Sequence, residues 1–257
     1  MSYALTAILI SVTLFLVMLA SVDIGRRVGT RHAARDPEKW SAGLGTVEGA
    51  VFGLMGLLVA FTFSGAASRF DTRRHLIVEE TNDIGTAYLR LDLLPPGAQP
   101  VLRDLFRRYL DSRLETYRKL PDIAAAAEEL SKSVRLQNEI WTQSVSACSA
   151  ASPQCTMLLL PALNAMIDIT TTRTMAAQMH PASIIFVLLF GLAVASALLA
   201  GYGMAQSQER SWLHMCAFAL TIALAVYVIL DIEYPRLGLI RVDDFDQGLV
   251  DLRNSIN

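Results

Sequence analysis

The sequence predicts an all-α membrane protein: four transmembrane helices and a helical extramembrane bundle, formed by extensions of spans 2 and 3 and a helical hairpin. Composition is the first reason, because 53% of the 257 residues are apolar and only 18% are charged, against roughly 25% charged in an ordinary soluble domain. The second reason is that four apolar segments of 85 residues contain a single charged side chain, Glu48; they are 3–22, 44–66, 182–204 and 212–230. The third is that no stretch alternates for long between apolar and polar side chains, as half-buried strands do.

Each apolar segment is long enough to cross a bilayer, whose core of about 30 Å requires ~20 helical residues. The spans must be helices, because lipid offers no partner to bare peptide groups. Segment 3–22 does not resemble a signal peptide, since it lacks a basic start and is followed by arginines instead of a cleavage site. The composition excludes a simple soluble enzyme, a disordered chain and a secreted disulfide-rich mini-protein. The net charge of −2, without a basic patch interleaved with aromatics, gives no indication of nucleic-acid binding.

The basic residues predict which side of the membrane each connection faces. The two short links between spans contain Arg26, Arg27, Arg31, Arg35, Lys39 and Arg210. By the positive-inside rule both links face the cytoplasm. Three arginines directly after span 2, Arg69, Arg73 and Arg74, argue against this orientation, but long domains translocate largely regardless of charge.

We therefore expect a multi-pass protein of the bacterial plasma membrane with both termini outside the cytoplasm. Residues 1–66 contain spans 1 and 2 and a cytoplasmic basic loop at 23–43. Residues 67–181 form an extracytoplasmic helical domain, 182–230 contain spans 3 and 4, and 231–257 form an extracytoplasmic tail.

Segment 67–181 is predicted to consist of helices. Span 2 continues without a helix breaker to Pro95, with a packing stripe of Phe70, Ile77, Ile84, Tyr88 and Leu91. Two further helices are predicted near 100–119 and 121–147, and Pro161 is expected to open a fourth, which runs to a kink at His180-Pro181. In the tail we expect an extended stretch at 237–242 and then a short helix, capped by Asp243 or Asp244, that packs on the bundle.

Two cysteines provide a second indication of topology. Cys148 and Cys155 flank a turn-rich stretch, and in an oxidising compartment this spacing indicates a local disulfide between two helices. Two unpaired thiols are the alternative. Cys216 lies in span 4 and is expected to fill apolar space. No cluster of Cys and His has metal-ligand spacing, and no metal or other cofactor is predicted.

Span 2 has two faces with different properties. Small residues at spacings of three and four let helices approach closely; these are Gly49, Gly53, Gly56 and Ala60. Another face is suited to line a narrow hydrophobic pore with charged mouths around the axis of a homo-oligomer; it consists of Glu48, Phe52, Met55, Val59, Thr62, Ala66 and Arg69. The same pattern also fits a lipid-facing or packed helix, with Glu48 as an interfacial acid that pairs with loop arginines.

Several motifs follow one another in the chain. They are Gly56-Leu-Leu-Val-Ala-Phe-Thr-Phe63, Arg69-Phe-Asp-Thr-Arg-Arg74, Glu79-Glu80 with Ile84-Gly85-Thr-Ala-Tyr88, Asn164-Ala-Met-Ile-Asp168, and Asp231-Ile-Glu-Tyr-Pro-Arg236 with Gly238. In order and spacing they are similar to the bacterial bestrophin-like membrane protein family of unknown function. The resemblance covers nearly the whole chain.

The resemblance implies more about fold than about function. The distant namesakes, the bestrophins, are oligomeric anion channels with a constriction on the second span. In this sequence basic residues stand where bestrophins place tryptophans after that span. Bestrophins also keep most of the protein in the cytoplasm, opposite to the orientation expected here. Chloride conduction therefore does not follow from the resemblance.

Two functional hypotheses remain. The first is an oligomeric ion channel or pore lined by span 2, in contact with the lipid bilayer and with inorganic ions. The alternative is a non-conducting membrane-anchored sensor or scaffold that acts through its periplasmic helical bundle. An enzyme is not predicted, because the sequence contains no nucleophile elbow, phosphate loop, metal cluster or convincing acid–base pair. A secondary transporter is disfavoured because no inverted repeat is visible in four spans.

Overall fold

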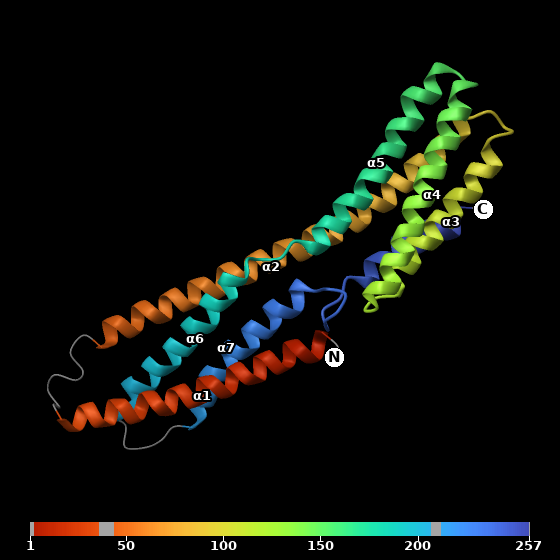
Figure 1. Cartoon of the computed structure of the whole chain (residues 1–257). Helices are drawn as coiled ribbons and strands as arrows, with labels where there is room; N and C mark the ends of the chain where they lie inside the picture. The colour runs from red at the N-terminus through yellow and green to blue at the C-terminus, as the bar shows by residue number, and fades with distance from the viewer. Residues whose placement is uncertain (1–2, 36–43, 207–211, 257) are drawn as a thin grey trace. The chain divides into compact units, whose positions relative to one another are not determined.

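The computed structural model describes residues 3–35, 44–206 and 212–256. All regular elements in these ranges are helices, which confirms the all-α prediction. The chain divides into two compact units (Figure 1). The first comprises Met1–Ser68 and His180–Tyr234, and the second comprises Arg69–Met179 and Pro235–Asn257.

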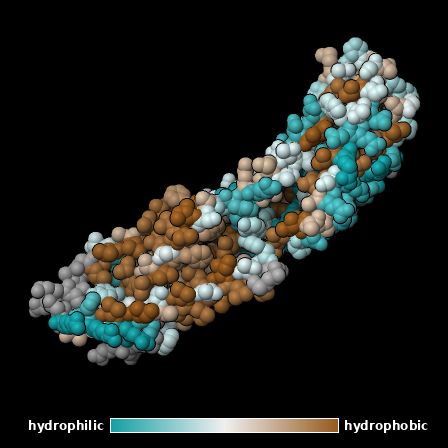
Figure 2. Space-filling model, viewed as in Figure 1, coloured by the Kyte–Doolittle hydropathy of each residue, from teal (hydrophilic) through white to brown (hydrophobic). Residues whose placement is uncertain are grey.

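The first unit contains the apolar helices. They are α1 (Tyr3–Arg35), the N-terminal half of α2 (Leu44–Leu89), α6 (Ser183–Gly203), which ends in the short helix η2 (Met204–Gln206), and α7 (Trp212–Glu233). Four helices of the described chain are long and apolar enough to cross a membrane, as predicted. The visible surface of this unit is mostly hydrophobic (Figure 2). Side chains that a soluble protein would bury are therefore available to lipid or to other membrane helices.

Glycines allow α1 and α6 to approach closely. A Cβ atom at Gly25 would lie 2.0 Å from the carbonyl oxygen of Leu198, and one at Gly201 would lie 2.0 Å from that of Val22. Ala193 and Ala197 of α6 are fully buried along the same contact. The α1–α6 pair is thus a backbone-to-backbone contact of the kind that small residues permit in membranes.

The second unit is a bundle around its own apolar core. It contains the C-terminal half of α2, η1 (Arg90–Leu93), α3 (Gln99–Arg118), α4 (Ile123–Ser149), α5 (Pro153–Gln178), η3 (Asp243–Asp246) and α8 (Gln247–Ser255). Figure 1 shows α3 and α4 side by side as an antiparallel pair. Phe106, Tyr109, Ile140, Leu163 and Leu249 are buried together in the core. The tail helix α8 therefore packs on the bundle as expected.

A buried hydrogen-bond network joins three bundle helices. The amide nitrogen of Gln137 on α4 donates to the hydroxyls of Tyr109 on α3 (3.0 Å) and Thr170 on α5 (2.9 Å). These two hydroxyls are also 3.1 Å apart. Buried polar groups that satisfy one another in this way fix the register of the helices that carry them.

Several helix boundaries differ from the sequence prediction. The helix that begins span 1 continues to Arg35, so Arg26, Arg27 and Arg31 lie on a helix and not in a loop, while Lys39 and Arg210 fall outside the described residues. Pro161 lies inside α5, and the expectation that it opens this helix is wrong. Pro153 takes the first turn instead, because Ser152 before it is extended and the Pro153 ring supplies a helical φ angle where no N–H is needed.

The tail also differs from its prediction. Residues 237–240 form turns and bends in place of the expected extended stretch, because the Val242 N–H donates to the Pro235 carbonyl at 3.0 Å and closes a loop. Neither Asp243 nor Asp244 caps a helix through its side chain. The Asp243 carboxylate accepts from Arg236 and Arg241 instead.

Candidate functional site

The glycine face of α2 is open in the single chain. Cβ atoms at Gly49, Gly53 and Gly56 would meet no atom of another helix within 4 Å in the described part of the chain, and Ala60 is exposed. The large side chains next to this face are also exposed: Phe61 is 68% exposed, and Leu54 and Leu57 are each more than half exposed. The three glycines for which sequence indicated helix packing therefore contact no other helix among the described residues.

The face of α2 that carries Phe52, Met55 and Val59 packs against other apolar helices of the same chain. Met55 is only 2% exposed and belongs to the apolar core that includes Met18 of α1 and Met215 of α7. The Phe52 ring lies 6.0 Å from that of Phe218, and Val59 packs against the same core. Ala66 is fully buried. Most of the side chains for which sequence indicated a pore lining thus contact the other membrane helices.

Three polar members of that face also have defined positions. The hydroxyl of Thr62 donates to carbonyl oxygens of its own helix, those of Leu58 and Val59. The carboxyl group of Glu48 lies against α6, where a Cβ atom at Gly203 would be 2.2 Å from Glu48 Oε1. This buried oxygen has no hydrogen-bond partner in the described part of the chain. Arg69 is partly exposed and belongs to the second unit.

The two cysteines lie at the hairpin between α4 and α5. Their sulfur atoms are 2.01 Å apart, the distance of a disulfide bond, and both residues are buried. Cys216 has a free thiol and is partly buried in α7. Among the described residues no group of three or more His, Cys, Asp and Glu side chains is arranged to hold a metal ion.

The second unit contains a buried cluster of charges that sequence reasoning did not assemble. We call it the arginine cluster: Glu80, Arg113, Arg173, Arg236 and Asp246, arranged around Tyr117. Glu80 is completely buried, and its carboxylate accepts from Arg113 Nε at 2.6 Å and also from Arg173 Nη1. A carboxylate with two guanidinium partners satisfies the requirement that buried charges be paired.

The ring of Tyr117 is the centre of the cluster. The guanidinium carbons of Arg173 and Arg236 both lie 4.3 Å from the ring centroid, and that of Arg113 lies at 5.1 Å. The Tyr117 hydroxyl accepts a hydrogen bond from Arg113 Nη2. Burial raises the pKa of Tyr117, so the phenol is neutral and offers the cations its ring quadrupole, not a negative charge.

Arg236 connects the cluster to the tail. It forms a bidentate pair with Asp246, with Nη1–Oδ2 and Nη2–Oδ1 distances of 2.7 and 2.8 Å. Burial by itself lowers the pKa of Arg236. The hydrogen bond and the negative charge of Asp246 together raise this pKa by more than burial lowers it, so the pKa lies above its usual value. By contrast, burial and the neighbouring positive charge of Arg236 lower the pKa of Arg173.

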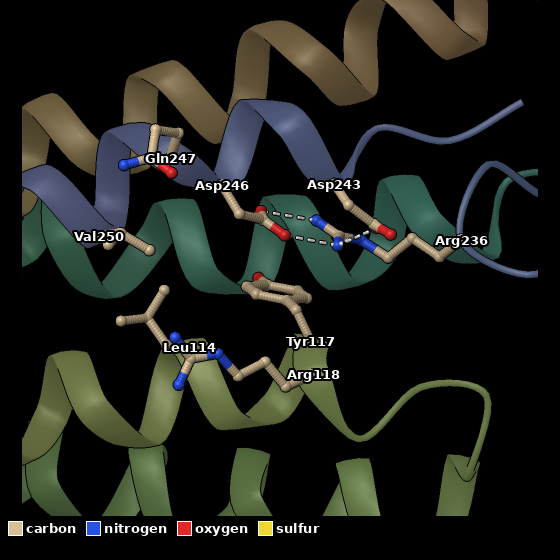
Figure 3. Close-up of a pocket in the computed structure, with 8 residues that line it drawn as sticks. All are labelled: Leu114, Tyr117, Arg118, Arg236, Asp243, Asp246, Gln247 and Val250. Atoms are coloured by element: carbon tan, nitrogen blue, oxygen red, sulfur yellow. Dashed lines mark hydrogen bonds and ion pairs between the residues drawn. The ribbon is translucent and has the colours of Figure 1, made fainter.

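A small cavity opens beside the arginine cluster (Figure 3). Its volume is about 200 Å³, and it is lined by Leu114, Tyr117, Arg118, Arg236, Asp243, Asp246, Gln247 and Val250. In Figure 3 the Tyr117 ring projects from α3 toward Asp246 and the start of α8. The cavity therefore brings a neutral phenol and polar side chains of α3 and the tail to one place.

Only part of this arrangement had a signal in the sequence. Glu80 and Arg236 occur within two of the motifs quoted above, but nothing in their spacing indicates that they belong to one cluster. Arg113 and Arg173 stand within α3 and α5, and an arginine in a helix usually lies in solvent.

Comparisons with known proteins give a consistent result. The family model described as the bestrophin-like domain matches residues 12–245. No curated protein matches the chain. Among solved structures, a crystal structure of a bacterial bestrophin homologue from Klebsiella pneumoniae has a TM-score of 0.64 at 12% identity and covers 93% of this chain and 98% of that chain.

Two more solved structures are similar. Another variant of the Klebsiella pneumoniae homologue has a TM-score of 0.63 at 14% identity, covering 93% of this chain and 99% of that chain. A crystal structure described as a membrane protein has a TM-score of 0.60 at 13% identity, with coverages of 93% and 98%. At such identities the likeness shows the fold alone. The family itself follows from the sequence match, which spans most of the chain: the protein belongs to the bestrophin-like family of membrane proteins.

Proposed function

We propose that the protein is an oligomeric ion channel or pore whose conducting path is lined by α2 from each copy. Its membership of the bestrophin-like family supports an ion-conducting role. The observation that carries the proposal is the burial of the four apolar helices. Only 11% of the apolar window of α2 is buried within the chain, against 33%, 28% and 39% for the windows of the first, third and fourth candidate spans. Among the four candidate spans of the described chain, α2 therefore leaves the largest share of its apolar window open to other copies or to a pore.

The open face of α2 is the better candidate for the lining. The face of Glu48, Phe52, Met55, Val59, Thr62 and Ala66 is largely occupied by the chain's own helices, as described above. The open face carries small residues around Gly53 and Ala60, with the exposed ring of Phe61 beside them. Small residues next to an aromatic ring leave space for ions and provide a hydrophobic constriction that can gate by dewetting.

Conductance measurements on two matched phenylalanine variants test the lining. Purified protein in planar bilayers is expected to conduct inorganic ions, and Phe61→Ala is expected to change the single-channel conductance at least about twofold because it widens the constriction. Phe52→Ala is expected to lower the stability of the chain with a smaller effect on conductance. Leu224→Ala, at an exposed position of α7, serves as the control for lipid-facing truncation.

Two outcomes contradict this assignment. If Phe52→Ala alters conductance and Phe61→Ala does not, the lining is the face of Glu48 and Met55. If folded oligomers remain silent under varied voltage and ions, the non-conducting sensor or scaffold is the better description.

We also propose that the bundle and both termini lie outside the cytoplasm of a bacterial plasma membrane. Two observations support this orientation. The first is the group of arginines at the C-terminal end of α1. The second is the disulfide bond between Cys148 and Cys155, because disulfide bonds persist in oxidising compartments. In intact cells, an impermeant thiol reagent is expected to label both cysteines after reduction with an impermeant reductant and denaturation of the outer face. Protection of both from outside, with labelling only after lysis, would reverse the topology.

A further inference from the structure

The C-terminal third of α1 carries a row of exposed arginines on the side that points away from α6. The other side is held close to α6, because a Cβ atom at Gly29 would lie 2.6 Å from the carbonyl oxygen of Tyr202. This packing continues to within two turns of the end of α1 and fixes which side chains point outward. Arg27, Arg31 and Arg35 follow one another at intervals of four residues, and all three are exposed. Side chains at this spacing lie on one side of a helix.

The same side of α1 is apolar before the arginines begin. Val17 and Ile24 stand fourteen and seven residues before Arg31, which places all three on one side of the helix, and they are 41% and 53% exposed. At the C-terminal end of α1, Figure 2 shows a hydrophilic strip that directly adjoins hydrophobic surface. A change from exposed apolar side chains to arginines within two turns marks the level at which acyl chains give way to headgroups.

This part of α1 has a clear excess of positive charge. Between Asp23 and the end of the helix at Arg35 stand four arginines, whereas Asp23 is the one acidic residue of this described stretch. Asp23 pairs with Arg27 at 2.6 Å. Neither Arg31 nor Arg35 forms an ion pair with any described residue. Two exposed guanidinium groups are therefore available at the end of an apolar surface.

An anionic phospholipid fits this side of α1 better than a free phosphate ion. Arg31 and Arg35 are separated by about 6 Å along the helix axis, within the roughly 5–8 Å thickness of one headgroup layer. Both guanidinium groups can therefore reach phosphate oxygens of the same layer, to which arginine donates in a bidentate manner. Val17 and Ile24 lie farther along the helix, at the depth of the acyl chains. A free phosphate ion would leave this apolar part without a partner.

We propose that the side of α1 formed by Val17, Ile24, Arg31 and Arg35 binds an anionic phospholipid. The two guanidinium groups hold the headgroup phosphate, and an acyl chain lies along the two apolar side chains. In the orientation proposed above this end of α1 meets the cytoplasmic leaflet, whose anionic lipids attract basic residues next to a membrane helix. The site requires only that α1 crosses the bilayer, and it does not depend on whether the protein conducts ions.

Native mass spectrometry of the full-length protein, released from detergent after removal of bound lipid, tests the proposal. The protein is titrated with dioleoyl phosphatidylglycerol or with dioleoyl phosphatidylcholine, which has the same acyl chains but no net charge. We expect the wild type to bind phosphatidylglycerol at least about twentyfold more tightly, because each arginine near an anionic lipid surface contributes about a fivefold gain in affinity.

Two matched double variants assign this preference to α1. Arg31→Gln with Arg35→Gln is expected to lower the affinity for phosphatidylglycerol about twentyfold and to leave that for phosphatidylcholine unchanged. Arg108→Gln with Arg135→Gln removes the same charge from exposed positions of α3 and α4 and is expected to bind both lipids like the wild type. If the first double variant does not fold, Arg31→Gln alone decides, with an expected loss of about fivefold.

Inorganic phosphate distinguishes a lipid site from a phosphate site. Added at the same concentration as phosphatidylglycerol, it is expected not to displace the bound lipid, since it has no acyl chain. The proposal is overturned if inorganic phosphate displaces the lipid, if the wild type binds the two lipids equally well, or if the two double variants lose the same affinity for phosphatidylglycerol.

Discussion

At the scale of single residues, Glu80 is a fully buried carboxylate that depends on its ion pairs. It stands on α2 with no exposed surface, and its carboxylate accepts from guanidinium groups of α3 and α5. Taking an ion pair out of water costs about as much as the attraction returns, so the intact cluster adds little to net stability. Removing one member is different, because the remaining charges stay buried without compensation.

Glu80→Ala is accordingly expected to destabilise the protein by about 3–5 kcal/mol. Glu115→Ala, which removes the exposed partner of Arg118, is expected to cost less than about 1 kcal/mol. Denaturant unfolding in detergent, followed by circular dichroism, measures both. A similar small effect for the two variants would mean that the Glu80 side chain is solvated in solution.

Glu129 gives a pH-dependent contribution at the α3–α4 hairpin. The hydrogen bond from Lys119 Nζ, 2.9 Å from Glu129 Oε1, lowers the pKa of this carboxyl below its usual value, with smaller help from Lys132 and Ser112. Because the folded-state pKa is the lower one, the stabilisation is complete above the ordinary glutamate pKa of about 4.3 and is lost as the pH falls through the folded-state value.

Glu129→Gln is therefore expected to reduce the loss of stability between neutral pH and about pH 3. Glu128→Gln, at the exposed neighbouring position, is expected to leave the slope of stability against pH closer to that of the wild type. Melting temperatures recorded across this pH range provide the comparison, and equal slopes for the two variants would contradict the assignment.

At the scale of elements, the α1–α6 pair depends on the absence of side chains. The carbonyl oxygens of Leu198 and Val22 occupy the positions that Cβ atoms of Gly25 and Gly201 would take. Backbone atoms cannot move aside as the end of a flexible side chain can, so any substitution must separate the two helices. The separation would also open the apolar core that Met18 and Ala197 share.

Gly201→Ala is expected to destabilise the first unit by about 1–3 kcal/mol. Gly53→Ala, where a Cβ atom meets nothing, is expected to be neutral or slightly stabilising for the single chain, since alanine is the better helix former. Thermal unfolding in detergent distinguishes them, and a tolerated Gly201→Ala would show that α1 and α6 are farther apart in the membrane.

At the scale of the whole molecule, the open face of α2 indicates that a single chain is incomplete. A helix with glycines along its uncovered side is unusual for a surface that faces only lipid; in an oligomer whose path is lined by α2, this face lies towards the axis and the neighbouring copies. We expect the detergent-solubilised protein to have the mass of a homo-oligomer.

Gly53→Leu is expected to reduce the oligomer mass or block conductance while the helical circular dichroism signal stays unchanged. Gly191→Leu, at a glycine of α6 that also has nothing within 4 Å, is the matched control and is expected to do neither. Light scattering of the purified complexes measures the mass. If both variants behave like the wild type, the open face of α2 contacts lipid.

The sequence was informative where one physical signal dominates. Charge-free segments of about twenty residues have no stable alternative to a membrane helix, and the continuous α2 followed from the lack of any breaker before Pro95. The two faces of α2 could not be assigned because both are apolar, and the choice depends on how α1 and α7 cover Met55. The arginine cluster was not predictable because its members come from α2, α3, α5 and the tail, and only the tertiary fold brings them together.

Two separate features oppose a continuous helix between α5 and α6: hydrogen bonds from Arg73 and the ring of Pro181. In a continuous helix the carbonyl oxygens of Ala176 and Met179 would accept from the N–H groups of residues 180 and 183. Arg73 of α2 already donates to both oxygens, at 3.1 and 2.9 Å, and Pro181 independently opposes helix at this point because its ring clashes with the carbonyl of residue 177. A proline alone does not end every helix of this chain, since Pro161 lies inside α5, so the break rests on both determinants together. A substitution at Pro181 would leave these two Arg73 hydrogen bonds in place, so part of what interrupts the helix comes from α2 and lies about a hundred residues away in the sequence.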